Sequence, residues 1–586
     1  MPRRFKISRA LFFCATALPP CLIAALILKY GVDFPFEDQW SLAHLFVRFK
    51  EGTLTLDKLF GLQNEYRQFF PNLIIIGLGW LTRWDVRFEM FFSFLLAALI
   101  SFNVHRLGKQ TFGAGDSERR RIAFLLSNLL IFSPVQYLNW LMGEQLVYFF
   151  PAACVTTCLV IACSGMGPWK RFALCACLST VSTFSAANGI FCWVVVFPAL
   201  ARGGARGVSK GTRLRLGLAC ASGFALCAAG YFYNYQSPAH HPSPLAALGH
   251  PLRAAAHFLS LLGSTLAGES AYVLPVAVAA GAVLFSLYVA HAVVVRRAGT
   301  EHELTRRSVG WLMLGAYSLL TAATVTAGRS AIGVAQSSAS RYTTFTLYLI
   351  VALIHLVALS RGAEAGKVRA RNLLPARLIP AVLVLMLGLH ALACVIALQQ
   401  MGLLRTRLLQ AKACHMFVNV VPDTACLARH VLPELEDLRG WTNALDELGF
   451  WRPGLVKSNR VEEFADATPA SGDYGSFDVL SKEGDTYLAS GRAMLPHRGE
   501  PADAVLLAYE TTEGAHVAFA QAELKNRGYV FIRFWQNGAR QDPGWRKSFR
   551  ASELPHGATR LTAWAFDAQT GKAFKLEGTH ELKAAQ

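Results

Sequence analysis

The sequence ALFFCATALPPCLIAALIL, residues 10–28, is the first long apolar run of the chain and decides the class of fold. It is about as long as the roughly 20 residues that an α-helix needs to cross a bilayer. Four basic residues precede it: Arg3, Arg4, Lys6 and Arg9. The residues that follow it, Lys29-Tyr30-Gly31, form a poor cleavage site, so we expect a retained signal anchor with a cytoplasmic N-terminus.

The composition agrees with a membrane protein. Of the 586 residues, 53% are hydrophobic and only 16% are charged, which is too apolar for a soluble multidomain protein. The net charge of +19 comes from basic residues in short loops between apolar runs. This distribution reports membrane topology, and the chain lacks the motifs of nucleic-acid-binding proteins, so we exclude that class.

Eight further apolar runs of spanning length follow, near residues 88–105, 122–141, 145–164, 216–234, 271–295, 309–327, 342–360 and 379–400. Region 172–201 is long for one span, and basic residues flank it on both sides. Both flanks therefore belong on the same side of the membrane, which predicts two short helices with a turn at Ser185–Gly189. The count becomes eleven transmembrane helices.

The predicted topology then follows from the charges. The basic loops 106–121, 165–171, 202–215, 296–307 and 361–377 all fall in the cytoplasm with the N-terminus. The other connections, and the whole tail after about residue 401, are expected to be external.

We therefore predict three regions. Residues 1–401 form an α-helical polytopic transmembrane domain whose first external loop is 30–86, and residues 402–472 form a helical connector. Residues 473–586 form an external β-sandwich, because short alternating runs such as Ala504–Tyr509 are separated by turn signals such as Lys482-Glu483-Gly484-Asp485.

The first external loop has structure of its own. Residues 40–50 have the pattern of an amphipathic helix, and the apolar segment 71–81 is too short to span, so we expect it to lie at the membrane interface. A second short apolar helix is expected to end near Leu266.

The cysteines indicate packing in one part of the chain and a disulfide in another. Ten of the thirteen lie in the early apolar runs, where small thiols fill space between helices. Cys414 and Cys426 lie in the tail, so a disulfide between them is expected if the tail is in the oxidising periplasm.

The segment Phe34-Pro35-Phe36-Glu37-Asp38-Gln39-Trp40 is the candidate reactive centre. Two adjacent acids stand just beyond the first span, where one can hold a raised pKa or recruit a cation. A positioned carboxylate is the natural general base for a hydroxyl that attacks a sugar carbon. The structural alternative is that Glu37 and Asp38 cap the helix that starts near Gln39.

Three arginines are candidate ligands of a lipid phosphate. Arg67 belongs to the segment Asn64-Glu65-Tyr66-Arg67, while Arg329 and Arg341 flank an external loop, where the positive-inside tendency disfavours arginine. The alternatives are an ion pair between Arg67 and Glu65, and snorkelling of the other two side chains to the interface.

Other polar residues are ambiguous. Glu144 lies at an external turn and is either a site residue or part of a hydrophilic hinge. His240 and His241 are expected to lie in a plain loop, because adjacent histidines point apart and no third metal ligand is evident. Trp545 and Trp564 are either exposed platforms for sugars or core residues of the β-domain.

These features together resemble the GT-C class of membrane glycosyltransferases, which use polyprenyl-phosphate-linked sugars. The motifs Glu37–Trp40 and Asn64–Arg67, with the segment from Gly328-Arg329 to Ser340-Arg341-Tyr342, are similar to a poorly characterised bacterial group of this architecture. The resemblance implies that Glu37 or Asp38 is the catalytic base, sometimes beside a metal ion, although the usual order, Asp then Glu, is reversed here. Seven residues are candidate supporting residues: Gln39, Trp40, Asn64, Glu65, Tyr66, Glu144 and Tyr342.

The function expected from the sequence is transfer of a sugar from a polyprenyl-phosphate donor to an envelope glycan, lipid or protein, outside the bacterial inner membrane. The use of a divalent metal ion stays open. The alternatives are a transporter or flippase for a lipid-linked saccharide, which would predict charges within the spans and internal repeats, and a non-catalytic envelope assembly protein.

Overall fold

The computed structural model describes residues 8–582 with internal gaps. The gaps are 64–65, 114–115, 203–207, 237–242, 244–245, 300–301, 362–377, 424, 428–437, 467–471, 525–543 and 556–557. Asn64, Glu65, His240 and His241 lie outside the described residues.

The chain divides into two compact units. Unit 1 comprises Met1–Gly31, Thr53–Thr82 and Val86–Gly402, and unit 2 comprises Val32–Gly52, Arg83–Asp85 and Leu403–Gln586. Unit 2 therefore contains the chain from Leu403 onward. Two pieces of the predicted first external loop, however, belong with the tail and not with the helical domain.

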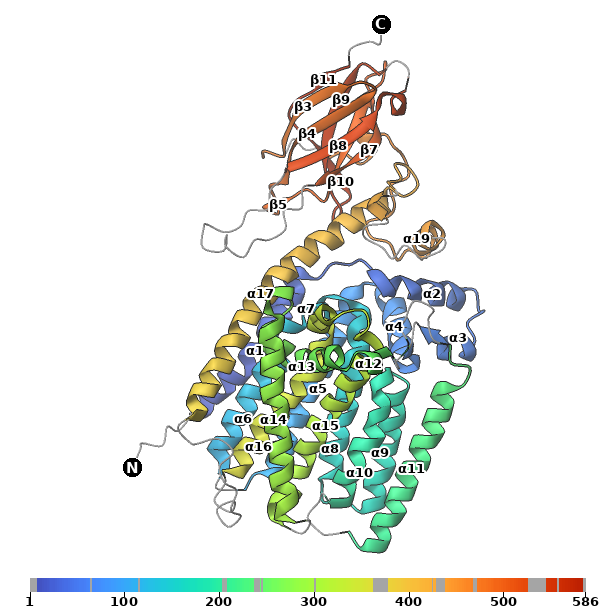
Figure 1. The fold of residues 1–586 in the computed structure, drawn as a ribbon. Coiled ribbons are helices and arrows are strands. Elements are labelled where there is room, and N and C mark those ends of the chain that lie inside the picture. The colour runs from blue at the N-terminus through green and yellow to red at the C-terminus, as the bar shows by residue number, and fades with distance from the viewer. Residues whose placement is uncertain are drawn as a thin grey trace. The chain divides into compact units, whose positions relative to one another are not determined.

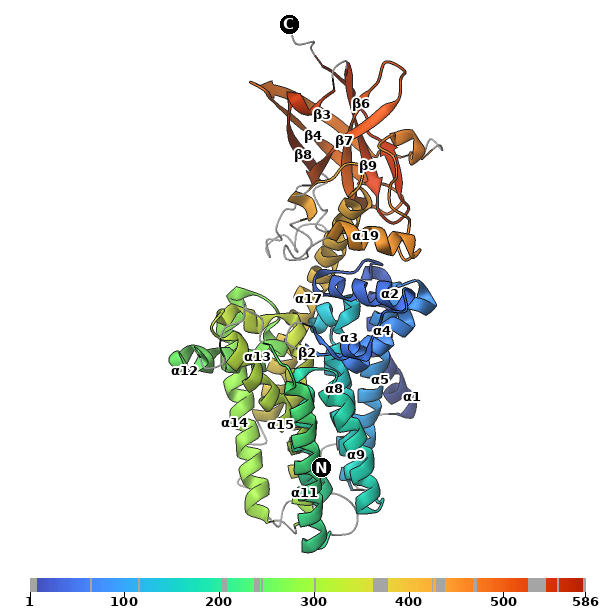
Figure 2. The ribbon, with the colours of Figure 1, turned by 90° about the vertical axis from the view of Figure 1, so that its right-hand side faces the viewer.

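Unit 1 is a bundle of long apolar helices, which run side by side in Figure 2. In the described part of the chain, nine helical segments are long and apolar enough to cross a membrane. They are Arg9–Tyr30 (α1), Val86–Thr111 (α5), Ser117–Leu141 (α6 to α7), Gly143–Ala162 (η4 and α8), Lys210–Phe232 (α11), Leu274–Ala298 (α14), Glu303–Arg329 (α15), Ser340–Ser360 (η8 and α16) and Ala381–Met416 in α17, which is Leu378–Met416. Each corresponds to one predicted long span, which confirms a multi-pass membrane protein.

Region 172–201 forms two short helices, α9 (Pro168–Thr183) and α10 (Phe191–Arg202), as predicted. The 3₁₀ helix η5 (Ala187–Ile190) connects them. At this turn a Cβ on Gly189 would lie 1.7 Å from the carbonyl oxygen of Ser182, so only glycine fits. The amide of Asn188 donates a hydrogen bond to the Tyr317 hydroxyl (2.7 Å), which ties the turn to α15.

Short helices and a two-stranded hairpin lie at one end of the bundle (Figure 1). We call this the hairpin end. They include α3 (Leu56–Phe60), the hairpin of β1 (Leu62–Gln63) and β2 (Tyr66–Arg67), and α4 (Phe69–Thr82), which contains the predicted interfacial segment. The backbone N–H of Phe70 donates to the carbonyl of Phe184, so α4 begins where α9 ends.

Helices α13 (Pro251–Ala267) and α14 approach each other through two glycines. A Cβ on Gly263 would lie 1.9 Å from the carbonyl oxygen of Ala277, and one on Gly281 would lie 1.8 Å from that of Leu259. The two backbones are therefore in direct contact, as is common for small residues between membrane helices.

Replacing Gly263 by alanine is expected to destabilise the protein by about 1–3 kcal/mol, because the added methyl group must push the two helices apart. Gly388→Ala in α17 is the matched control, since a Cβ there would meet no described atom within 4 Å. The measurement is the unfolding temperature of the purified full chain in detergent. Equal unfolding temperatures for the two variants would contradict the helix contact.

Unit 2 contains short helices and a sheet domain. Its helices are η1 (Glu37–Leu42), α2 (Ala43–Lys50), the C-terminal part of α17, and α19 (Leu438–Glu447). The predicted amphipathic helix at 40–50 thus starts as a 3₁₀ helix and continues as α2.

The sheet domain consists of nine strands among the described residues. They are β3 (Gly475–Glu483), β4 (Thr486–Leu495), β5 (Glu500–Pro501), β6 (Ala504–Glu510), β7 (His516–Leu524), β8 (Gly544–Arg550), β9 (Arg560–Asp567), β10 (Lys572–Lys575) and β11 (His580–Glu581). The strand order is β10-β9-β6-β7-β8-β4-β3, with β11 on β9 and β5 on β4, and every pair is antiparallel. The predicted strand at Ala504–Tyr509 is therefore present as β6.

The sheet is strongly twisted (Figure 2) and curls until its edges meet. The N–H of Phe477 in β3 donates to the carbonyl of Glu577, and the N–H of Glu577 donates to that of Gly475. One core fills the curl and contains Trp545. Trp545 and Trp564 are both buried, so the hypothesis that they are exposed platforms for sugars is wrong.

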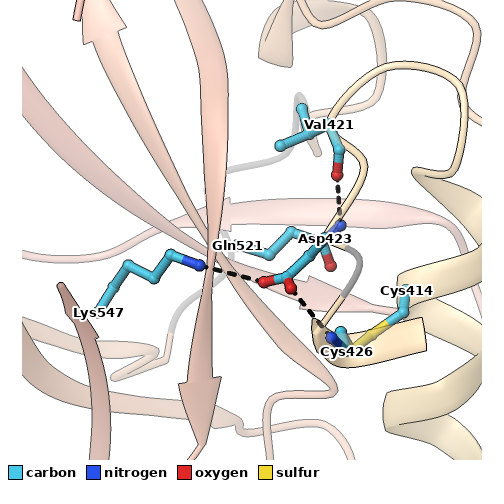
Figure 3. Close-up of a disulfide and its surroundings, with 6 residues drawn as sticks. All are labelled: Cys414, Val421, Asp423, Cys426, Gln521 and Lys547. Carbon is cyan, nitrogen blue, oxygen red and sulfur yellow. Dashed lines mark hydrogen bonds and ion pairs between the residues drawn. A yellow bond between two sulfur atoms is a disulfide. The ribbon is translucent and has the colours of Figure 1, made fainter. Parts of the chain in front are cut away.

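Figure 3 shows a disulfide between Cys414, in the last turn of α17, and Cys426. The sheet holds the segment that this disulfide closes, since the Gln521 amide donates to the carbonyl of Val421 (2.8 Å). The ammonium group of Lys547 forms an ion pair with Asp423 (3.1 Å). The segment that follows α17 thus packs on the sheet domain through β7 and β8.

Replacing Cys414 and Cys426 by serine is expected to destabilise unit 2 by about 2–3 kcal/mol, because the crosslink closes a short loop. Unfolding followed by tryptophan fluorescence, with and without reductant, measures the effect. The double variant without reductant should match the reduced wild type. Free thiols at both positions in protein purified without reductant would contradict the prediction.

Candidate functional site

The two candidate acids belong to unit 2, at the start of η1. Glu37 has φ 48°, a left-handed conformation that is uncommon for residues other than glycine and is enriched at functional sites. The carboxylate of Asp38 makes no hydrogen bond or ion pair with any residue that the structure describes, while its backbone carbonyl accepts from the Ser41 hydroxyl (2.6 Å). Neither η1 nor α2 has a side-chain cap, so the capping alternative finds no hydrogen bond to support it.

The neighbours of these acids, Gln39 and Trp40, are buried. Trp40 stacks on His415, with ring centroids 4.7 Å apart and an interplanar angle of 13°, and also contacts Trp451. In the same cluster Phe46 packs against Trp84. These contacts explain why residues 32–52 and 83–85 group with the tail, and they give Trp40 a structural role.

An ion pair that the sequence did not reveal lies in the same part of unit 2. The guanidinium of Arg452 contacts the carboxylates of Asp33 (2.9 Å) and Asp85 (3.6 Å). Asp33 and Arg452 also line a cavity of about 10 Å³, which is the space of roughly one water molecule. This cavity is too small for a sugar.

The candidate cations belong to unit 1, and the structure separates their roles. Arg67 is buried, and its guanidinium donates to the carbonyls of Tyr231 (2.7 Å), Phe60 (2.7 Å) and Tyr233. It also lies over the ring of Phe60. Arg67 therefore holds the hairpin to the end of α11, and these bonds favour a structural role over the expected phosphate contact.

Arg341 differs from Arg67, because its guanidinium bonds to no described backbone carbonyl and, like that of Arg67, forms no ion pair with a described carboxylate. Its Nε atom is buried and has no hydrogen-bond partner in the described chain. Its neighbours are phenols: it lies over the ring of Tyr342 at 5.2 Å, and Tyr148 and Tyr66 act on it electrostatically. A half-buried cation beside phenol groups, with a buried and unpartnered Nε atom, is suited to an anionic ligand.

Arg329 is the last residue of α15 and is half-buried. A cation in this position interacts favourably with the negative end of the helix dipole, which is a sufficient structural reason for its presence.

Glu144 lies at the hairpin end in η4 (Gly143–Gln145) and is buried. Its Oε1 atom accepts from the amides of Gln63 (3.3 Å) and Gln68 (3.4 Å), which flank the Asn64–Arg67 motif. The structure thus brings the two residues that flank this motif to Glu144, which the sequence could not show. We call Gln63, Gln68, Asn72, Glu144 and Gln145 the polar cluster; all but Gln63 are buried.

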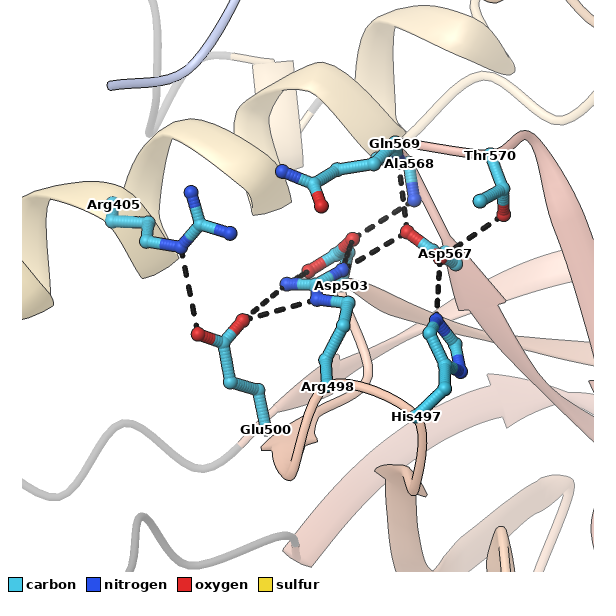
Figure 4. Close-up of polar contacts among 9 residues, drawn as sticks. All are labelled: Arg405, His497, Arg498, Glu500, Asp503, Asp567, Ala568, Gln569 and Thr570. Atoms are coloured by element: carbon cyan, nitrogen blue, oxygen red, sulfur yellow. Dashed lines mark hydrogen bonds and ion pairs between the residues drawn. The ribbon is translucent and has the colours of Figure 1, made fainter. Parts of the chain in front are cut away.

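A charge network in unit 2, shown in Figure 4, has a structural role. The guanidinium of Arg498 contacts Glu500 (2.6 Å), Asp503 (2.8 Å) and Asp567 (2.9 Å), and Glu500 also faces Arg405 of α17 (3.5 Å). Burial alone would lower the pKa of Arg498, but the three carboxylates raise it. The network fastens the β4–β6 connection, the end of β9 and α17 together.

The network predicts acid sensitivity. Burial raises the pKa of Asp567. Three contacts outweigh burial and leave this pKa below its ordinary value: the backbone N–H of Gln569, the charge of Arg498 and the hydrogen bond with His497. A carboxylate with a lowered folded pKa stabilises the protein above its unfolded pKa of about 3.9 and loses this contribution as the pH falls through the folded pKa. The pKa of Asp503 is raised, mainly by burial, and this offsets part of the acid sensitivity that Asp567 causes.

Asp423 allows a test with one substitution. Burial raises its pKa, but the N–H of Cys426 and the charge of Lys547 outweigh burial and lower it. We expect the full chain to lose stability below about pH 4. Between about pH 6 and pH 3, the free energy of unfolding should fall less for Asp423→Asn than for the wild type, because the variant has no carboxylate to protonate at this position. Urea unfolding at several pH values measures this. Parallel pH profiles for the two proteins would contradict the assignment.

Comparison of the chain with models of known protein families gave no match, and no curated protein or solved structure matched it significantly. The class is therefore defined by the structure itself. The protein is a multi-pass membrane protein with a C-terminal sheet domain.

Proposed function

We propose that this protein is a membrane glycosyltransferase of GT-C type, which moves a sugar from a polyprenyl-phosphate donor to an envelope glycan, lipid or protein. The observation that carries the proposal is Arg341, a guanidinium with a buried, unpartnered Nε and no carboxylate among its described partners. A lipid phosphate would supply the missing anion, and its lipid tail suits a protein whose body is a bundle of apolar helices.

The proposed topology has a cytoplasmic N-terminus and eleven crossings in the bacterial inner membrane, with α9 and α10 as a pair of short spans. The hairpin end and the sheet domain then face the periplasm. The basic loops and the Cys414–Cys426 disulfide support this orientation.

In the proposed reaction, an acceptor hydroxyl oxygen attacks the anomeric carbon of the donor sugar. The new carbon–oxygen bond forms as the bond to the phosphate oxygen breaks, with inversion. The hydroxyl proton moves to a carboxylate. The candidates are Asp38 of unit 2, whose side chain has no described partner, and Glu144, which belongs to unit 1 together with Arg341. Arg341 holds the charge of the departing polyprenyl phosphate.

The other candidates take supporting roles. Glu37 fixes the turn that presents Asp38. The phenol groups of Tyr342 and Tyr66 border Arg341. Arg67 holds the hairpin to the end of α11. Glu144 is the alternative base, and Arg329 remains a second candidate cation.

Reconstitution tests the proposal. The full chain is placed in liposomes with a panel of polyprenyl-phosphate sugars that carry radiolabel in the sugar, together with envelope extract as acceptor. Movement of label from the lipid to the extract is expected for at least one donor. Label that changes leaflet but stays on the lipid would instead identify a transporter. If no donor gives transfer to the extract or a change of leaflet, both functions are refuted.

A further inference from the structure

Three buried amide oxygens near Glu144 have no hydrogen-bond donor in the described chain. They are Gln68 Oε1, Asn72 Oδ1 and Gln145 Oε1. All three side chains are at least nine-tenths buried. Buried polar atoms in native proteins almost always have a partner, so orphan oxygens on these neighbouring elements indicate a water or a ligand.

The orphans lie on elements that meet at Glu144. Gln68 reaches Glu144 directly, and Asn72 follows Gln68 by one helical turn, since the Asn72 N–H donates to the Gln68 carbonyl (2.8 Å). Residues four apart share a helix face. Gln145 is next to Glu144 in η4.

At Gln68 the missing partner is a donor. The Gln68 amide nitrogen already donates to the Glu144 carboxylate, so a flipped amide would place its oxygen against the carboxylate and lose that bond. The polar cluster therefore lacks an O–H or N–H donor at Gln68. A hydroxyl group of a sugar ring supplies such a donor.

The position of the polar cluster relates it to the phosphate site. Tyr66 lies between Gln63 and Gln68 in the hairpin, and Tyr148 follows Glu144 by four residues. The ring of Tyr148 contacts that of Phe345, with centroids 5.0 Å apart, and Phe345 follows Arg341 by four residues. The elements that carry the amides thus also border the proposed phosphate site.

The geometry points to the polar cluster as a subsite that binds sugar hydroxyl groups beside the lipid phosphate. This inference rests on the proposed function and extends it, because it assigns Gln68, Asn72 and Gln145 to recognition of the sugar. The sugar is that of the donor or that of a saccharide acceptor, which share this chemistry.

The test compares Asn72→Leu and Gln145→Leu, which keep side-chain size and remove the orphan oxygen. Gln110→Leu is the matched control, since Gln110 is exposed and bonds to Val160 at a distance from the polar cluster. Binding of three probes to the full chain in detergent is measured by native mass spectrometry. The probes are farnesyl phosphate, a panel of farnesyl-phosphate hexoses, and methyl hexosides.

For a donor subsite, each cluster variant should bind the preferred farnesyl-phosphate hexose about three- to tenfold more weakly, which is the loss of about one hydrogen bond. Binding of farnesyl phosphate should stay unchanged. For an acceptor subsite, the variants should instead weaken only the methyl hexosides. The control should match the wild type in every arm.

Stability provides a second readout. Without ligand, the unfolding temperature of the cluster variants should equal or exceed that of the wild type, because an unpaired buried oxygen is removed.

Two binding results would overturn the subsite. One is that the variants weaken the binding of farnesyl phosphate and of its hexosides equally, and the other is that they leave sugar binding unchanged. Failure of farnesyl phosphate to bind the wild type, with hexosides still bound through the cluster, would refute the proposed donor and leave the sugar subsite standing.

Discussion

Replacing Asp38 by asparagine is expected to lower the rate of sugar transfer by about 10²- to 10⁴-fold, because the amide cannot accept the proton of the acceptor hydroxyl. Asparagine keeps the size of the side chain. The unfolding temperature should hardly change, since the Asp38 carboxylate has no described partner to lose. Transfer of radiolabelled sugar from membrane lipid to envelope material, in cells with equal amounts of each variant, measures the effect.

Glu37→Gln is the matched control for this prediction. It makes the same chemical change one residue away, and we expect a smaller loss if Asp38 is the base and Glu37 shapes the turn. Near-normal transfer by both amide variants would remove the base from η1. Glu144 would then be the next candidate, and Glu144→Gln the variant to measure.

Replacing Arg341 by alanine is expected to weaken donor binding by about 10- to 100-fold, because a charge-assisted hydrogen bond contributes about 1.5–3 kcal/mol. Arg341→Lys should recover part of the loss, since it keeps the charge but not the planar donor set. Binding of farnesyl phosphate to the purified full chain provides the measurement.

Arg67 supplies an internal control for Arg341. Because its guanidinium holds three backbone carbonyls, Arg67→Lys should lower stability by roughly 1–3 kcal/mol and leave the affinity of the folded protein for farnesyl phosphate near normal. The opposite pattern, with stability lost at Arg341 and affinity lost at Arg67, would reverse the assignment of the two residues.

Much of the helical architecture could be predicted from the sequence. The nine long apolar segments appear where the hydropathy places them, because the length needed to cross a bilayer is a strong constraint on composition. The charge on both flanks of 172–201 also sufficed to predict α9, α10 and the turn between them. Strand β6 followed from a short apolar run bounded by turn signals, although its first five residues are all buried and do not alternate.

The site residues were less predictable, because their partners are remote in sequence. Arg67 bonds to carbonyls more than 160 positions away, and a backbone carbonyl leaves no trace in a sequence. The polar cluster joins Gln68 to Glu144 across 76 positions. The sequence left Trp545 open between an exposed platform and a core residue, because strand alternation does not tell which face is buried once a sheet curls.

The contact between Gly263 and Gly281 also has an evolutionary consequence. In most packed pairs, a larger residue on one side can be balanced by a smaller residue on the other. Here each glycine faces a carbonyl of the opposite helix and is already the smallest residue, so no such exchange exists. Sequences that descend from the same ancestor should therefore keep both glycines, or lose them only together with the α13–α14 contact, and the pair offers a marker by which distant relatives can be recognised.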